Sequence, residues 1–350
     1  MSTFDRLADL SLSVDSYELE RLEQAVSSDF TRVTTIVHLR GGGEEGVGED
    51  VTYNSGDQDI QLERGAVLPL AGDWTLRSFS AALGDLELWP SPPAMEAQRD
   101  YRRWAYESAA LDLALSQAGT SLVDALERDA SPVTYVVSMR LGNPPSLDRL
   151  RGWAELYPGL KAKLDPTSDW DQSLVDELNA MGVIDSVDLK GRYEGTVVDN
   201  PPDPRLYALV AEGFPQAWIE DPALTPETEA VLEPHRDRIT WDAIIHSVAD
   251  IEALPFPPRM LNVKPSRFGT LEALFAAYDY CSERGIGTYG GGQFELGAGR
   301  GQIQYLASVF SPGAPNDVAP SGFNSGEPRA GLPSSPLEPA IAPVGFRWTA

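Results

Sequence analysis

The chain has 350 residues, 42% of them hydrophobic, and carries a formal net charge of −26. A chain of this length can bury a large core and can hold one large and one smaller domain. The strong negative charge disfavours nucleic acid and anionic membranes as partners, and no hydrophobic run reaches the length of a membrane span. We therefore expect neither a nucleic acid nor a membrane as a binding partner.

The single cysteine, Cys281, excludes an internal disulfide and a cysteine-based zinc cluster. The first residues lack the basic and then hydrophobic pattern of a signal peptide. These two observations predict a cytoplasmic protein.

The first part of the chain, residues 1–128, predicts a small α+β domain. Residues 32–39 are rich in β-branched side chains, and the segment that follows is rich in glycine and acidic residues. No GxGxxG pattern joins a strand to a helix there, so a dinucleotide-binding loop is not expected. The expected elements are strands over 16–25 and 32–39, a turn with a return strand over 40–54, and helices over 74–86 and 94–118.

Residues 129–320 predict a parallel barrel. Short hydrophobic runs alternate with helical segments, and five runs end in charge, at Lys163, Asp188, Glu220, Asp242 and Lys264. These positions recur at roughly 22 to 32 residues, the length of one strand plus one helix and loops. About eight such units predict a closed, TIM-like (β/α)7β barrel, in which the ends of the strands meet at one mouth.

The other expected barrel elements are strands over 133–141, 287–289 and 317–320 and helices over 147–156, 173–181, 205–212, 271–284 and 302–310. Residues 321–343 are rich in proline, glycine and serine and predict an extended tail. We expect the C-terminal segment, 321–350, to pack back on the smaller domain through residues 344–348.

Lysine is restricted to four positions in the whole chain, while all other basic side chains are arginine. Lysine can lose its proton when its pKa is lowered, whereas arginine effectively cannot. The four lysines are therefore candidates for acid–base chemistry: Lys161, Lys163, Lys190 and Lys264.

Three carboxylates end adjacent strands, and a lysine stands on each side of them. Asp188, Glu220 and Asp242 offer oxygen ligands of the kind that Mg²⁺ prefers, and Mn²⁺ suits the same donors. Lys163 or Lys264 could then remove the proton next to a metal-bound substrate carboxylate. Because side chains on a strand alternate, Lys161 is expected on the same side as Lys163, where its charge would lower the pKa of that base.

In this order and spacing the residues resemble the enolase superfamily, specifically its mandelate racemase and muconate-lactonising-enzyme-like members. The segment from Lys161 to Lys163 is similar to that family's Lys-x-Lys motif, and Lys264 is similar to its second lysine. Asp188, Glu220 and Asp242 match its metal ligands. The turn ending at Glu295 resembles its strand-seven segment, and residues 41–53 and 107–115 resemble its capping domain. The resemblance covers most of the chain.

The chain also departs from that family. Lys190 stands where an asparagine is usual, and Ala243 stands where an acidic residue often follows the third ligand. No aspartate pair like that of dipeptide epimerases is evident near the eighth strand. Lys190 could bind a second anionic group of the substrate or could disturb the metal site.

The resemblance implies Mg²⁺-dependent abstraction of the proton α to a carboxylate, with a metal-stabilised enediolate. Lys163 and Lys264 on opposite faces favour racemisation or epimerisation of a small acid. β-Elimination on the same scaffold is the alternative, as in a dehydratase, an o-succinylbenzoate-synthase-like enzyme or a cycloisomerase. A catalytically inactive barrel that only binds ligands is a further alternative.

The remaining candidates have supporting roles in this hypothesis. Lys161, Lys190 and Glu295 are expected to bind substrate or to tune the pKa of the base. Asp221 should face away from Glu220 and serve the structure, and a backbone-bonded role is expected for His246. The partner is a small carboxylate, and association into a homo-oligomer is left open.

Overall fold

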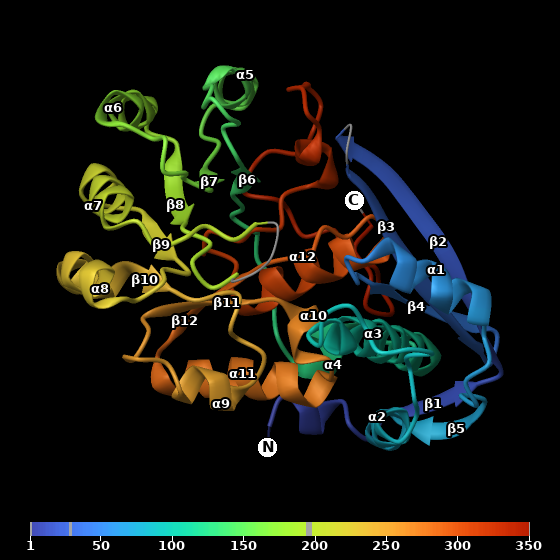
Figure 1. Ribbon diagram of the computed structural model, residues 1–350. Coiled ribbons are helices and arrows are strands. Elements are labelled where there is room, and N and C mark those ends of the chain that lie inside the picture. Colours follow the sequence, from blue (N-terminus) through green and yellow to red (C-terminus); the bar gives the residue numbers. More distant parts are fainter. Residues whose placement is uncertain (1, 28–29, 194–197, 350) are drawn as a thin grey trace.

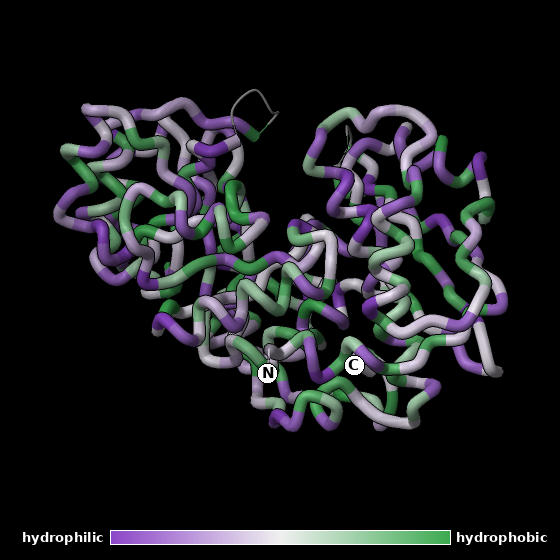
Figure 2. Tube along the Cα trace, turned by 90° about the horizontal axis from the view of Figure 1, so that it is seen from below, coloured by the Kyte–Doolittle hydropathy of each residue, from purple (hydrophilic) through white to green (hydrophobic). Residues whose placement is uncertain are grey.

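The computed structural model describes residues 2–27, 30–193 and 198–349 (Figure 1). The chain forms two lobes, and hydrophilic residues are spread over both of them (Figure 2). Within the described ranges, no helix is both long and hydrophobic enough to cross a bilayer.

The smaller lobe is built on a three-stranded antiparallel sheet in the order β2-β3-β4 (Figure 1). Its helix α3 (Gln98–Ala118) lies against β4 and ends, as predicted, at Gly119 with a φ of 65°. A side chain at Gly46 or Gly48 would clash with the backbone of α3. The glycines of this acidic hairpin therefore allow the helix to approach the sheet closely. The three strands are β2 (Ser16–Ser27), β3 (Phe30–Gly41) and β4 (Glu44–Asp50).

The sequence does not predict several elements of this lobe. The helix α1 (Ser55–Arg64) is mostly polar and shows little hydrophobic periodicity, although Asn54 caps it by accepting from the backbone N–H of Asp57. The short ladder of β1 (Ser11–Val14) with β5 (Gly72–Thr75) joins segments far apart in the sequence. The helix α2 (Leu76–Gly84) lies within the predicted range 74–86. The remaining elements are η1 (Phe4–Arg6) and α4 (Leu122–Leu126).

Among its described residues, the larger lobe has seven parallel strands in two ladders. The first ladder runs in chain order from β6 to β10, and the second pairs β11 with β12. Their bounds are β6 (Val137–Met139), β7 (Ala162–Leu164), β8 (Ile184–Asp188), β9 (Trp218–Glu220), β10 (Ile239–Thr240), β11 (Met260–Val263) and β12 (Gly287–Gly290).

Hydrogen bonds outside these ladders close the ring. The backbone N–H of Asn262 donates to the carbonyl oxygen of Trp241 at 3.0 Å, and this bond joins the two ladders. The backbone N–H of Asp317 donates to the carbonyl oxygen of Gly290 at 2.8 Å. The backbone N–H of Val136 donates to the carbonyl oxygen of Asn316 at 2.9 Å. Residues 316–317 thus fill the eighth strand position between β12 and the start of β6. The predicted (β/α)7β barrel with an α+β capping domain is confirmed.

Helices surround the barrel, and α5 to α8 fan out along one side in Figure 1. The helix after β9 is absent from the predicted elements because it is short, although Thr225 and Thr228 form a capping box at its start. The helices of the larger lobe are α5 (Asp148–Leu156), α6 (Gln172–Met181), α7 (Pro204–Gly213), α8 (Pro226–Leu232), η2 (Glu233–Arg238), α9 (Val248–Glu252), α10 (Pro265–Phe268), α11 (Leu271–Arg284), α12 (Ala298–Phe310) and η3 (Ser321–Asn324).

The C-terminal tail contacts both lobes. Phe323 packs against three aromatic rings of the barrel, with centroid distances of 5.6 Å to Tyr135, 4.7 Å to Trp153 and 5.0 Å to Tyr157. Further on, the N–H of Phe346 donates to Asp112 of α3 at 2.7 Å, and the Arg347 guanidinium donates to the same carboxylate at 3.0 Å.

Replacing Phe323 by alanine is expected to destabilise the protein by about 3–5 kcal/mol, because the ring is 1% exposed and its loss leaves a cavity among three aromatic side chains. Chemical denaturation of Phe323→Ala would measure the change. Val344→Ala is the control, because Val344 is 39% exposed and should matter little. A loss below about 1 kcal/mol for Phe323→Ala would show that the tail adds little to the fold.

Candidate active site

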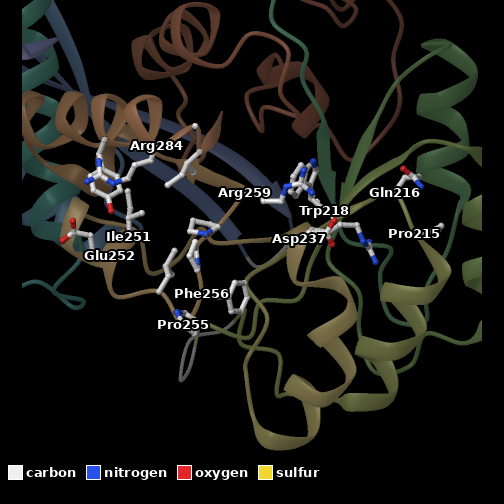
Figure 3. A pocket seen from close by; sticks show the side chains of 17 residues that line it. Pro215, Gln216, Trp218, Asp237, Ile251, Glu252, Pro255, Phe256, Arg259 and Arg284 are labelled. Carbon is white, nitrogen blue, oxygen red and sulfur yellow. Dashed lines mark hydrogen bonds and ion pairs between the residues drawn. The ribbon is translucent and has the colours of Figure 1, made fainter.

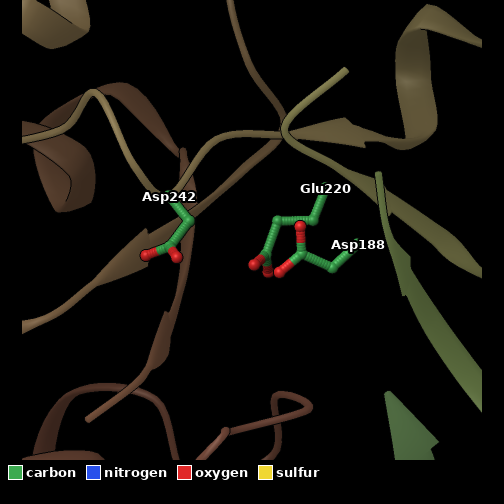
Figure 4. Close-up of side chains that lie close together, drawn as sticks. All are labelled: Asp188, Glu220 and Asp242. Atoms are coloured by element: carbon green, nitrogen blue, oxygen red, sulfur yellow. The ribbon is translucent and has the colours of Figure 1, made fainter. Parts of the chain in front are cut away.

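Three carboxylates form a cluster at the carboxyl ends of neighbouring strands. Asp188 ends β8, Glu220 ends β9, and Asp242 follows β10 by two residues. All three are fully buried, and one oxygen from each lies within 4.8 Å of the others (Figure 4). Buried carboxylates at this spacing need positive charge, and their oxygens suit a divalent cation. The residues present therefore fit a metal site.

The two expected base residues reach this cluster from opposite sides. Lys163, from β7, contacts Glu220 directly and lies 3.3 Å from Asp188 Oδ2. Lys264, which follows β11, donates from Nζ to Asp242 Oδ2 at 2.9 Å. Both lysines are buried, with exposures of 1% and 6%. The fold thus places one lysine at each end of the row of carboxylates.

The charges in the cluster shift each other's pKa values. Burial by itself lowers the pKa of Lys163, but the carboxylates of Glu220 and Asp188 outweigh it and raise that pKa well above its ordinary value. Burial by itself raises the pKa of Asp188, but Lys190 and Lys163 hold it below its ordinary value. The sequence prediction of a lowered pKa for Lys163 is thus not met by the protein's own groups. A cation bound at the carboxylates would lower the pKa of Lys163, which is the predicted direction.

Lys161 does not join the cluster, which corrects its expected position. It precedes β7, and its Nζ donates to the carbonyl oxygen of Gly182 at 3.0 Å in an exposed hydrogen bond. Gly182 caps the C-terminus of α6. The strand begins only at Ala162, so the alternation that placed Lys161 beside Lys163 does not extend to it.

Lys190 contacts Asp188 of the carboxylate cluster. Its Nζ donates to Asp188 Oδ2, and its backbone N–H donates to Asp188 Oδ1 at 3.1 Å. Burial lowers its pKa, but Asp165 and Asp188 outweigh this and raise the pKa well above its ordinary value. Lys190 is therefore held as a cation beside the proposed metal ligands.

Glu295 lies apart from the three carboxylates, where the two lobes meet. It accepts from the backbone N–H of Gln293 at 2.6 Å and pairs with Arg300 at 3.3 Å. Glu49 of the capping sheet stands nearby, and the pKa of Glu49 is raised by burial and by the charge of Glu295. Glu49 also accepts from the backbone N–H of Gly299 at 2.9 Å. The structure thus places Glu295 in the contact between the lobes.

Further residues of the site were not singled out from the sequence. Arg267 of α10 donates to Asp242 Oδ1 at 2.6 Å and to the hydroxyl of Tyr193 at 3.1 Å. The Tyr193 hydroxyl donates to Asp242 Oδ2 at 2.9 Å, and the Tyr289 hydroxyl donates to Glu220. The only sequence signal for Arg267 is its position three residues after Lys264.

Two supporting residues lie as the sequence analysis expected. Asp221 accepts from the backbone N–H groups of Asp242 and Ala243, both at 2.8 Å, so it holds the strand end that presents Asp242. Burial and the charges of Asp242 and Asp188 raise the pKa of Asp221 to about 7. The ring of His246 bonds to the backbone oxygen of Ala243 at 3.1 Å.

A cavity of about 1150 Å³ lies away from this site (Figure 3). Its wall includes Gln216, Arg238, Arg259 and Ile286, which precede β9, β10, β11 and β12 in turn. These residues mark the amino ends of the parallel strands, whereas the three carboxylates mark the carboxyl ends. The cavity and the candidate site therefore lie at opposite ends of the barrel.

Two domain models of one family match the chain. They are described as the N-terminal and C-terminal domains of a domain of unknown function (DUF8230), and they match residues 5–125 and 129–325. Among curated proteins, the chain is similar to the o-succinylbenzoate synthase of Geobacillus kaustophilus, with 29% identity over 255 residues, 69% of this chain and 65% of that protein. The o-succinylbenzoate synthase of Bacillus subtilis (strain 168) is 28% identical over 226 residues, 61% of this chain and 58% of that protein. The chain thus spans less than two thirds of the length of these relatives.

Solved structures share the fold. A dipeptide epimerase from Enterococcus faecalis V583 superposes with a TM-score of 0.70 at 15% identity, covering 97% of this chain and 100% of that chain. An enolase superfamily member from Listeria innocua superposes with a TM-score of 0.65 at 18% identity, covering 89% and 86%. The chain belongs to the family of the DUF8230 domain models, and its fold is that of the enolase superfamily.

Proposed function

We propose that the protein catalyses a metal-dependent β-elimination of water that begins with removal of the proton α to a carboxylate, as in an o-succinylbenzoate-synthase-like reaction. The observation that carries the proton-removal step is the placement of Lys163 and Lys264 on either side of three carboxylates that fit a metal, a placement that suits racemisation as well. The names of the curated relatives favour elimination over racemisation. The elimination that the sequence analysis held as an alternative thus becomes the leading proposal.

Each side chain has a defined role in this proposal. Asp188, Glu220 and Asp242 would hold Mg²⁺, and Mn²⁺ fits the same oxygen donors. When bound, the cation supplies positive charge that stabilises the oxyanion left by the departing proton. Lys163 takes the proton from the carbon next to the substrate carboxylate. Lys264 stays protonated and stabilises the negative charge that develops on the substrate.

The chemistry of o-succinylbenzoate defines the substrate class. Adding one water across the ring of this aromatic acid gives a hydroxycyclohexadiene carboxylate that carries a succinyl group. Lys163 takes the α-proton, and the neighbouring hydroxyl leaves as water when it takes up that proton from the Lys163 ammonium, which restores the aromatic ring and the neutral base. We propose such a small hydroxy-dicarboxylate as the substrate.

Purified protein with Mg²⁺ is expected to convert this hydroxycyclohexadiene carboxylate into o-succinylbenzoate, which can be followed by the ultraviolet absorbance of the aromatic product. Chelation of the metal should stop the reaction, and adding Mg²⁺ should restore it. Failure to form the aromatic product at saturating Mg²⁺ would rule out this substrate.

Racemisation or epimerisation of a small acid is the second candidate, because each lysine can serve one face of a substrate and a dipeptide epimerase shares the fold. The two candidates differ in heavy water. A two-base racemase should place deuterium at the α-carbon of recovered substrate, and an eliminating enzyme should yield an aromatic product instead. Deuterated substrate with no aromatic product would favour the racemase.

A further inference from the structure

Lys190 adopts a backbone conformation that turns it back onto a proposed metal ligand. Its φ is 54°, in the left-handed region that residues other than glycine rarely adopt. In this conformation both its N–H and its Nζ donate to Asp188. Lys190 therefore contacts both oxygens of a carboxylate that a metal ion would need, and its ammonium competes with the cation for Asp188.

A second acceptor lies within reach of Lys190. Asp165 follows β7 by one residue, and its Oδ2 accepts from Arg140 Nε at 3.2 Å. Its other oxygen, Oδ1, is buried and has no hydrogen-bond partner among the described residues. This oxygen stands 3.9 Å from Lys190 Nζ. A buried carboxylate oxygen that lacks a hydrogen-bond donor is unusual, and the nearby Lys190 ammonium is able to donate to it.

We propose that Asp165 receives the Lys190 ammonium when a divalent cation binds to Asp188. A small rotation of the lysine side chain would turn the 3.9 Å separation into a hydrogen bond and remove the Lys190 ammonium from Asp188 Oδ2. The ammonium then stays paired inside the protein, so Lys190 does not repel the cation at close range. Asp165 acts in this scheme as a positioning residue. The inference rests on the metal site of the proposed function.

A double-mutant cycle tests the coupling of the two residues. MgCl2 is titrated calorimetrically into the native protein, Asp165→Asn, Lys190→Asn and the double variant. Asp165→Asn should weaken Mg²⁺ binding about 10-fold or more in the native background, because Lys190 then stays on Asp188. In the Lys190→Asn background the same change should have little effect. Lys190→Asn alone should bind Mg²⁺ more tightly than the native protein.

The outcomes separate the inference from the proposed function. Equal weakening by Asp165→Asn in both backgrounds would mean that Asp165 only adds negative charge, and this overturns the inference while the metal site stands. No weakening in either background overturns it as well. If the native protein binds no Mg²⁺, the metal site and the inference both fail. Circular dichroism and thermal unfolding of each variant would confirm that it is folded.

The scarcity of lysine allows a second readout without any assay of activity. Protein labelled with ¹³C at the lysine Cε should give one signal for each of the four lysines. The Lys190 signal is identified by its loss in Lys190→Asn, and Lys161, which is only partly buried and lies outside the cluster, serves as the reference. Saturating Mg²⁺ should shift the Lys190 signal in the native protein and shift it differently in Asp165→Asn. The same Mg²⁺-induced shift in both proteins would overturn the inference.

Discussion

Replacing Lys163 by arginine is expected to lower the rate of the proposed reaction by about 10²- to 10⁴-fold, the usual contribution of a general base. Arginine keeps the positive charge that pairs with Glu220 and Asp188, but it effectively cannot lose its proton. The variant should therefore keep its fold and its Mg²⁺ affinity while losing the chemical step. Initial rates with the hydroxycyclohexadiene carboxylate, together with a Mg²⁺ titration, would measure both.

Lys161→Arg is the matched control for this experiment, because it makes the same change two residues away at an exposed hydrogen bond. Its rate should stay within about threefold of the native rate. Lys163→Arg with near-native activity would remove Lys163 from the role of base and point to Lys264. Equal losses in the two variants would indicate a structural effect on β7.

Asp188→Asn is expected to abolish tight Mg²⁺ binding and, with it, the proposed activity. The change removes one of three buried carboxylates whose oxygens lie within 4.8 Å of one another. In the native protein, Mg²⁺ at 100 times its dissociation constant should add about 2.7 kcal/mol to the free energy of unfolding and raise Tm. Asp188→Asn should show no such rise. Calorimetry and thermal unfolding with and without Mg²⁺ measure the two effects.

Asp185→Asn controls for the loss of a carboxylate from the same strand. Asp185 lies three residues before Asp188 on β8, so its side chain points to the opposite face of the strand. Mg²⁺ should stabilise Asp185→Asn as it does the native protein. Unchanged Mg²⁺ binding in Asp188→Asn would contradict the three-carboxylate site, and the proposal of metal-assisted proton removal would then fail.

Much of the site could be placed from the sequence because the carboxyl ends of successive parallel strands meet at one end of a barrel. That rule alone predicts that five side chains meet at one end of the barrel, namely Lys163, Asp188, Glu220, Asp242 and Lys264. It failed for Lys161, because the regular strand does not extend back to that residue. It could not place Glu295, because this residue follows an irregular Gly-rich turn in which Phe294 has a φ of 60°.

Other partners depend on contacts between segments far apart in the chain. Arg267 reaches Asp242 from α10, which follows the neighbouring strand β11. Asp165, which follows β7, faces Lys190, which follows the adjacent strand β8. No local pattern marks such pairs, since each side chain is ordinary in its own segment. Only the distances and the burial in the folded chain identify these pairs.

The sequence by itself determined the class of fold, the order of the strands and the three carboxylates, because period and spacing along the chain decide which residues end a strand. Only the tertiary structure decided how the ring closes through residues 316–317, how the tail packs, and which lysine forms an ion pair with which carboxylate. These features come from long-range packing and from the balance of buried charges. Both depend on three-dimensional distances that no local pattern encodes.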